Sequence, residues 1–115
     1  VGYSRAIRIG NRLEISGTTA VDDSGAIIGV GNPYQQTLFI LQKIENVMKE
    51  AGFALDTVVR TRMYVADITQ WEEIGRAHGE FFAVIKPVTT MVQVARLIDR
   101  DMLVEIEISA ELYDI

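Results

Sequence analysis

Residues 6–16 alternate between apolar and polar side chains in a pattern that predicts a β-hairpin. The apolar positions of this alternation are Ile7, Ile9, Leu13 and Ile15. Gly10-Asn11 lies between the two apolar pairs and suits a two-residue hairpin turn. Further along, Asp22-Asp23-Ser24-Gly25 predicts a second turn, flanked by short strands over residues 17–21 and 26–30.

Two segments have the three-to-four-residue spacing of apolar positions that is typical of amphipathic helices. The first is expected to begin at Asn32-Pro33 with Gln35 as the capping-box partner, and to end at Gly52. Its apolar positions are Tyr34, Leu38, Leu41, Ile44, Val47, Met48 and Ala51. The second is expected to begin with a capping box from Thr69 to Glu72 and to end before Pro87. Its apolar stripe comprises Trp71, Ile74, His78, Phe81 and Ile85.

Three later segments, over residues 57–65, 89–95 and 103–113, are predicted to be strands. The first two are rich in β-branched residues, and the third alternates strictly between apolar and polar positions. The order strands, helix, strand, helix, strands predicts one two-layer α+β domain over residues 1–115, with both helices packed on one face of a mixed sheet. The other face is expected to carry Val58 and Tyr64 with several Thr and Met residues, which indicates a subunit interface there.

Composition and charge exclude several classes of function. The chain has 115 residues, no cysteine and one histidine, His78, so neither a thiolate nucleophile nor a histidine-rich zinc site is expected, and no metal or cofactor is predicted. Eleven basic residues against sixteen acidic ones give a net charge of −5, which argues against a nucleic-acid partner. No apolar run reaches the ~20 residues of a membrane span, and no signal-peptide pattern is present, so a cytoplasmic protein is expected.

Short motifs in a characteristic order extend over essentially the whole chain. They are Gly2-Tyr3, Ile15-Ser16-Gly17, VRTRMYVAD over residues 59–67, VARL over residues 94–97 and VEIE over residues 104–107. Their order and spacing resemble the Rid/YjgF family, also called the L-PSP endoribonuclease family. The resemblance implies a chorismate-mutase-like fold and a homotrimer with three small-molecule clefts between its subunits.

The resemblance also implies a chemistry. In its best-known branch, the family hydrolyses 2-aminoacrylate-type enamines and imines to 2-keto acids and ammonia. The family glutamate that positions or activates the water falls on Glu105, the ligand-side tyrosine on Tyr3, and the Ser-Gly pair on Ser16 and Gly17. Glu105 is therefore the candidate catalytic residue, and the other three are candidate substrate contacts.

The arginine that clamps the substrate carboxylate in that branch is not present here. The family's Pro-x-Arg-Ser reads Pro87-Val88-Thr89-Thr90, so Thr89 occupies the arginine position. Met91 replaces a cysteine of the cleft, and Gly75 replaces an asparagine. The chain thus resembles the branch without the clamp, with Thr89 and Met91 as candidate substrate contacts. An uncharged hydroxyl in place of a bidentate guanidinium costs a few kcal/mol of carboxylate binding, or roughly two to three decades in rate.

Each candidate has a simpler structural interpretation. Glu105 and Glu107 lie on one strand face about 7 Å apart, and without the resemblance a solvated or inter-subunit strand face is the favoured interpretation. Arg60 and Arg62 are expected to pair across strands with such acids. His78 is expected to be a hydrogen-bonded core or interface histidine. For Tyr3, two interpretations are equally favoured: it anchors the N-terminal segment, or it contacts the cleft of a neighbouring subunit. The arginines considered as replacements for the clamp are Arg5, Arg62, Arg76 and Arg96.

Three functions remain open from the sequence. The first is hydrolysis of small imines, enamines or related nitrogen compounds, with Glu105 handling the water and 2-aminoacrylate activity weakened by Thr89. The second is binding or sensing of a small metabolite by a trimer without turnover. The third, a ribonuclease, fits poorly because the chain is acidic and lacks a pair of histidines.

Overall fold

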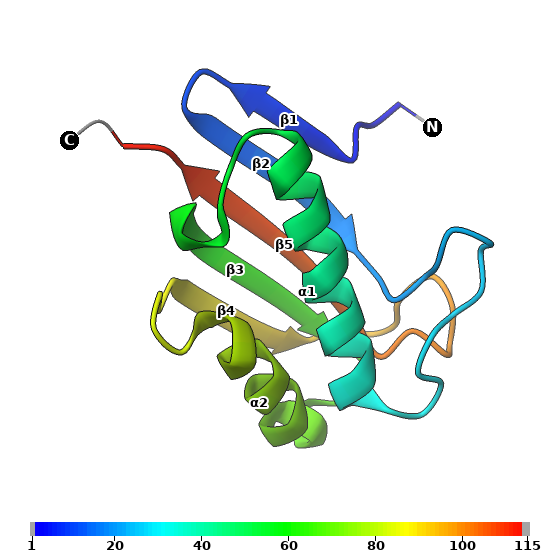
Figure 1. Ribbon diagram of the computed structural model, residues 1–115. Coiled ribbons are helices and arrows are strands. Elements are labelled where there is room, and N and C mark those ends of the chain that lie inside the picture. The colour runs from blue at the N-terminus through cyan, green and yellow to red at the C-terminus, as the bar shows by residue number, and fades with distance from the viewer. Residues whose placement is uncertain (1, 114–115) are drawn as a thin grey trace.

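The computed structural model describes residues 2–113, which form a five-stranded sheet with two α-helices on one face (Figure 1). The strands are β1 (Ala6–Ile9), β2 (Arg12–Thr18), β3 (Val58–Val65), β4 (Val88–Gln93) and β5 (Val104–Glu111). The helices are α1 (Pro33–Glu50) and α2 (Trp71–Phe82), and the short 3₁₀ turns are η1 (Leu55–Thr57) and η2 (Ile68–Gln70). The predicted α+β fold with two helices on one face of the sheet is confirmed.

The sheet is mixed, and its strand order is β1-β2-β5-β3-β4. The β3–β4 pair is parallel, and the other pairs are antiparallel. Parallel pairing requires a crossover, which α2 supplies between β3 and β4. β5 is the last strand in the chain but lies at the centre of the sheet, so it places residues 104–111 between β2 and β3.

The hairpin and the first helix begin and end for the reasons that the sequence indicates. Gly10 has a φ of 58°, the left-handed conformation that the tight turn between β1 and β2 requires. Asn32 caps α1, because its side chain accepts a hydrogen bond from the Gln35 backbone N–H at 2.9 Å. Gly52 follows the helix with a φ of 82°.

The core lies between the helices and the sheet. Side chains from both helices and from β2, β3 and β5 are fully buried there, the largest of which are Leu13, Ile40, Leu41, Ile44, Met48, Met63, Val65, Ile74, Val104, Ile106 and Ile108. The alternation predicted for the last strand is confirmed, because Val104, Ile106 and Ile108 face the helices. No helix within residues 2–113 has the length and apolarity that crossing a bilayer requires.

Local details of the second helix differ from the prediction. Thr69 does not cap α2, because it lies in η2, where its backbone N–H donates to the Asp67 side chain at 2.9 Å. α2 starts at Trp71, which is 56% exposed instead of belonging to the apolar stripe. The helix ends at Phe82, before Ile85.

The two short strands expected over residues 17–21 and 26–30 are also shorter than predicted. β2 continues to Thr18, and beyond it the only pairing in this segment of the described chain is a single bridge between Val21 and Ile27. The Asp22 side chain accepts hydrogen bonds from the backbone N–H groups of Ser24 and Ala26, so the expected turn is present.

The open face of the sheet is more polar than predicted. A register shift between Val58 and Arg60 turns Val58 toward the helices, where it is buried. Thr61 and Met63 are also buried on the helix side. The open face instead carries charged and phenolic side chains, namely Arg60, Arg62, Tyr64, Glu105 and Glu107. The exposed large apolar side chains of the strands are Ile7, Ile9, Val88 and Val92 on the edge strands and Val59 on β3. The assignment of Val58 and of Met63 to this face was therefore wrong, whereas Tyr64 lies on it as expected.

Candidate functional site

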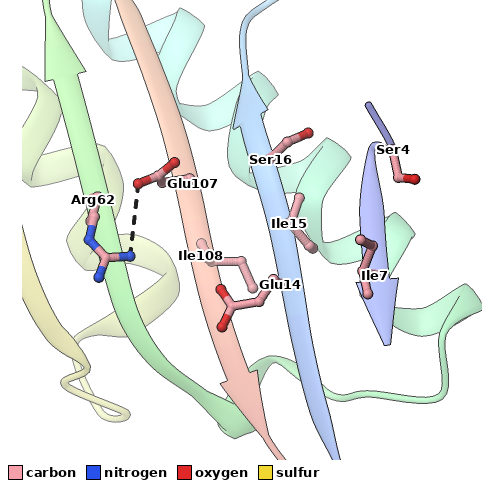
Figure 2. Close-up of a pocket in the computed structure, with 8 residues that line it drawn as sticks. All are labelled: Ser4, Ile7, Glu14, Ile15, Ser16, Arg62, Glu107 and Ile108. Carbon is pink, nitrogen blue, oxygen red and sulfur yellow. Dashed lines mark ion pairs between the residues drawn. The ribbon is translucent and has the colours of Figure 1, made fainter. Parts of the chain in front are cut away.

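A hollow of about 240 Å³ opens on the uncovered face of the sheet, where β1, β2, β3 and β5 pass side by side (Figure 2). Glu107 lies at one side of it and is already engaged. Its Oε1 accepts a hydrogen bond from the Tyr64 hydroxyl at 2.7 Å and lies 3.8 Å from Nη1 of Arg62. The predicted cross-strand pairing is thus confirmed for Arg62, whereas Arg60 donates to the Thr90 hydroxyl at 3.4 Å and not to an acid.

Glu105 lies one strand repeat away on the same face and has a different environment. Within residues 2–113 no side chain donates a hydrogen bond to it or forms an ion pair with it. Burial, and secondarily the charge of Glu107, raise the pKa of the Glu105 carboxyl. A carboxylate that is partly buried, unpaired and raised in pKa is suited to accept and return a proton.

Gly17 makes room for this carboxylate. A Cβ atom built at Gly17 would lie 2.7 Å from Cδ of Glu105, closer than real Cβ contacts allow. Gly17 belongs to β2, at the point where the register of the β2–β5 pair shifts, between Ile15 and Thr18. The bare backbone of Gly17 therefore forms the wall against which Glu105 lies.

The Ser16-Gly17 pair also lines a second, larger hollow of about 860 Å³, together with Tyr3, Arg5 and Lys43. Ser16 donates its hydroxyl proton to the Arg5 carbonyl oxygen at 3.0 Å. Tyr3 is 74% exposed at the mouth of this hollow. Four of the predicted site residues, Tyr3, Ser16, Gly17 and Glu105, are thus brought together, although Glu105 lines neither hollow itself.

The other two predicted site residues lie on the opposite face of the sheet. Thr89 and Met91 of β4 are paired with Thr61 and Met63 of β3, whose side chains point toward the helices. Met91 is half-buried against the core. β3 separates β4 from β5, so one chain does not bring Thr89 and Met91 to Glu105.

A line of hydrogen bonds connects Thr89 to the single histidine. The Thr61 hydroxyl lies 2.8 Å from the Thr89 hydroxyl and 2.9 Å from Nε2 of His78. His78 also packs on Phe82, with ring centroids 4.7 Å apart. Burial lowers the pKa of the imidazole, so it is neutral at neutral pH. The prediction of a hydrogen-bonded histidine is confirmed.

Comparison with known proteins identifies the family. The model of the family described as Endoribonuclease L-PSP matches residues 1–112. The chain belongs to this family, which is also called Rid/YjgF. A crystallised member from Mycobacterium tuberculosis, described as belonging to the YjgF/YER057c/UK114 family, superposes with a TM-score of 0.87 at 45% identity and covers 97% of this chain and 88% of that one.

The chain is also similar to two curated relatives. An uncharacterized protein of Streptomyces coelicolor is 36% identical over 109 residues, which are 95% of this chain and 81% of the relative. A protein of Acinetobacter baylyi named 3-aminoacrylate deaminase RutC is 28% identical over 104 residues, which are 90% of this chain and 82% of the relative.

The four arginines considered as substitutes for the family clamp have separate locations. Arg5 alone lines the larger hollow with Tyr3, Ser16 and Gly17. Arg62 lies at the smaller hollow beside Glu107 (Figure 2). Arg76 stacks on the Tyr34 ring at 4.4 Å, and Arg96 lines a hollow in the segment before β5. Of these four arginines, only Arg5 and Arg62 lie near the residues grouped with Glu105.

Sequence reasoning missed two polar residues near the candidate site. Lys43 of α1 lines the larger hollow, donates to the Val21 carbonyl at 2.8 Å, and has a pKa lowered by burial and by the charge of Arg5. Thr61 joins His78 to Thr89. Thr61 was visible in the sequence as a polar residue on a strand face otherwise formed by Met63 and Val65, whereas nothing in the pattern marked Lys43.

Proposed function

We propose that the chain is a hydrolase of small imine or enamine-type metabolites, in which Glu105 handles the water. The observation that carries the proposal is the state of Glu105. It is partly buried, has no partner within residues 2–113, and lies against the Gly17 backbone with a raised pKa. Its neighbour Glu107, a residue of the same type, is occupied by Tyr64 and Arg62.

The reaction requires one group that alternates between base and acid. As water adds to the C=N carbon, Glu105 accepts a proton from it and passes that proton to the nitrogen, which gives a neutral carbinolamine. Glu105 then accepts the proton of the carbinolamine hydroxyl and donates it to the departing nitrogen as the C–N bond breaks, which yields a carbonyl compound and ammonia. A carboxyl whose pKa is raised toward neutrality serves both steps better than an ordinary glutamate does.

The complete site is proposed to form between subunits of a homotrimer. Glu105, Ser16 and Gly17 would come from one subunit, and Thr89 with Met91 from the next. The positions of these two groups on opposite faces of the sheet support this, because a second copy is needed to bring them to one ligand. Tyr3, exposed near the mouth of the larger hollow, would close the ligand in.

Comparison of Glu105→Gln with Glu107→Gln tests the assignment of the carboxylate. Both changes keep size and remove charge, but only Glu105→Gln removes the proposed base, so hydrolysis should fall about 10²- to 10⁴-fold. Imines are generated in the assay by an amine oxidase and an amino acid oxidase, and ammonia release is followed after the assembly and folding of both variants are checked. Equal loss in the two variants would contradict the role of Glu105.

Activity on 2-aminoacrylate is proposed to be weak because Thr89 carries no charge for the substrate carboxylate. Thr89→Arg should raise the rate with 2-aminoacrylate by roughly two decades, by supplying a bidentate cation. A wild-type rate that already equals that of clamp-bearing relatives would contradict the argument and assign carboxylate binding to Arg5 or Arg62.

A binding trimer without turnover is the second candidate, and the uncharged Thr89 together with the thioether of Met91 favours it. Native mass spectrometry of the protein as purified distinguishes the two. A retained ligand that is never converted supports binding, and ammonia release from an imine supports hydrolysis. Ribonuclease activity, which the family's description names, is disfavoured by the net charge of −5.

A further inference from the structure

Three polar side chains form a continuous line from α2 to β4 on the helix-covered side of the sheet. His78 Nε2 lies 2.9 Å from the Thr61 hydroxyl, which lies 2.8 Å from the Thr89 hydroxyl. The Thr89 hydroxyl in turn lies 3.1 Å from the Pro87 carbonyl oxygen. Thr61 is fully buried and Thr89 is exposed, so the line begins inside the protein and ends at its surface.

Counting protons along this line determines what Thr89 offers to a ligand. Each hydroxyl has one proton and two lone pairs, and a neutral imidazole has one N–H. If Thr89 donates to the Pro87 carbonyl, then Thr61 donates to Thr89 and His78 donates from Nε2. If the line runs in the other direction, Thr89 donates to Thr61, and Thr61 donates to His78. In both cases the Thr89 proton is used within the protein, and only a lone pair remains for an outside partner.

The first of the two directions satisfies more groups. In this direction the Pro87 carbonyl and both hydroxyls are hydrogen-bonded, whereas in the second direction the Pro87 carbonyl receives no hydrogen bond from Thr89. The neutral state of His78 fits a line that needs one imidazole N–H. Burial alone lowers its pKa, and no charged side chain of residues 2–113 contributes to that shift.

We infer that Thr89 is a hydrogen-bond acceptor in the ligand site, so that the site selects compounds that present an N–H group to it and disfavours a carboxylate there. The inference rests on the proposed function to the extent that Thr89 lines the site. Thr61 and His78 are positioning residues: they donate along the line to Thr89, occupy one of its lone pairs, and leave its proton directed at the Pro87 carbonyl. The polarity at this position is thus the reverse of that of an arginine, which only donates.

The energetic difference follows from hydrogen-bond exchange. A carboxylate offers only acceptors, so Thr89 could bind it only after turning its proton away from the Pro87 carbonyl and losing that bond. An amide, amidine or imine N–H pairs with the free lone pair and leaves the line intact. The N–H compound adds one hydrogen bond, whereas the carboxylate exchanges one for another, and this difference of one hydrogen bond corresponds to about a tenfold preference for the N–H compound.

A matched pair of probes, acetamide and acetate, tests the inference without any turnover. NMR titration of the full-length protein as it assembles should give saturable shifts at the Thr89 amide with acetamide, at a concentration about tenfold lower than with acetate. Because His78 is the only histidine, its imidazole nitrogens give an unambiguous second signal. They should shift with acetamide although the probe does not touch them.

Three variants separate the hydrogen-bonded line from general structural effects. Thr89→Val should abolish both shifts, whereas the adjacent Thr90→Val, whose hydroxyl meets Arg60 on the open face, should leave them unchanged. In Thr61→Val, acetamide should still shift the Thr89 amide signal but should no longer shift the His78 imidazole signals. Thr61→Ser, which keeps the hydroxyl, should restore the His78 shift.

Two results would overturn the inference. One is acetate binding at Thr89 as tightly as acetamide, and the other is the absence of any saturable shift with acetamide. The hydrolase proposal can fail separately from this inference. If the protein binds acetamide more tightly than acetate but converts no imine, the result contradicts hydrolysis alone. If it hydrolyses imines but binds acetate more tightly than acetamide, the result contradicts the acceptor role alone.

Discussion

Glu105 and Glu107 are the same residue type in different surroundings, and the proposed role on water rests on that difference. The Glu107 carboxylate accepts from the Tyr64 phenol and faces the Arg62 guanidinium, which lower its availability as a base. Glu105 has neither partner and is held against a glycine. A charged group that is partly desolvated without compensation reduces stability, and such groups are concentrated at functional sites.

Gly17 is predicted to be required for function more than for folding. Gly17→Ala would place a methyl group against the Glu105 carboxylate, and the flexible glutamate end would move aside, so activity should fall at least tenfold while the fold is kept. Gly79→Ala is the control. It lies in α2 with open space around it, and should stabilise the helix by about 0.5 to 1 kcal/mol. Ammonia release and thermal melts of the two variants check the contrast.

Because the pKa of Glu105 is raised, replacing its carboxyl with an amide is predicted to stabilise the folded protein by an amount that depends on pH. Because the folded state disfavours the charged form, wild type loses stability as the pH rises through the folded-state pKa, which lies above the usual 4.5. Glu105→Gln should therefore melt higher than wild type at pH 7, and the difference should vanish near pH 3, where both states are protonated. Melting curves over this range measure it, and a difference that is constant with pH would contradict the shift.

At the scale of elements, one glutamine connects α1 to the segment that leads into β5. Gln36 is fully buried, donates from Nε2 to the Asp101 carbonyl at 2.8 Å, and accepts from the Leu103 N–H at 2.9 Å. A buried side chain with both ends satisfied holds two chain segments in one relative position. The position of Glu105, two residues after Leu103, therefore depends on a helix more than sixty residues earlier.

Gln36→Leu is predicted to lower the free energy of unfolding by about 2 to 3 kcal/mol, since it leaves the Asp101 carbonyl and the Leu103 N–H unpaired. Gln35→Leu, next to it on the exposed side of α1, should change stability by less than about 0.5 kcal/mol. Denaturant titrations give both values. Similar losses in the two variants would mean that the two hydrogen bonds of Gln36 do not determine the effect.

The sequence predicted elements well where one period governs a segment, and failed where a local hydrogen bond overrides it. The last strand and the bounds of α1 were placed correctly, although the buried face of α1 includes Ile40, which the predicted stripe omitted. Val58 was assigned to the wrong face because a register shift adds a residue that alternation does not reveal. Thr69 resembles a helix cap, but the Asp67 side chain uses its N–H in a turn that precedes α2.

At the scale of the whole molecule, the candidate site was predictable only as two unconnected groups. Family motifs identified Glu105 and Thr89 individually, but which face each occupies depends on strand order and register. Alternation within one strand says nothing of the neighbouring strand's register. The line of hydrogen bonds from Thr89 to His78 likewise depends on the packing of α2 on β3, a tertiary contact that the spacing of residues in the sequence does not determine.

The separation of the two groups leads to a prediction about assembly. If a second copy supplies Thr89 to the Glu105 of the first, the protein should be a homotrimer in solution, with a light-scattering mass of about three chains at micromolar concentration. Two defective variants should then complement each other. Glu105→Gln lacks the base, and Thr89→Phe blocks the other half of the site, so neither homotrimer should be active.

Co-expression of these two variants should restore activity, because some interfaces of the mixed trimers combine an intact Glu105 with an intact Thr89. Random assembly from equal amounts makes about a quarter of the sites intact, and about a quarter of the wild-type rate is the expected recovery. Mixing the separately purified trimers without subunit exchange is the control and should give none. If the co-expressed protein forms trimers of both chains yet remains inactive, Glu105 and Thr89 do not serve one shared site. Full activity of either variant alone would remove that residue from the site altogether.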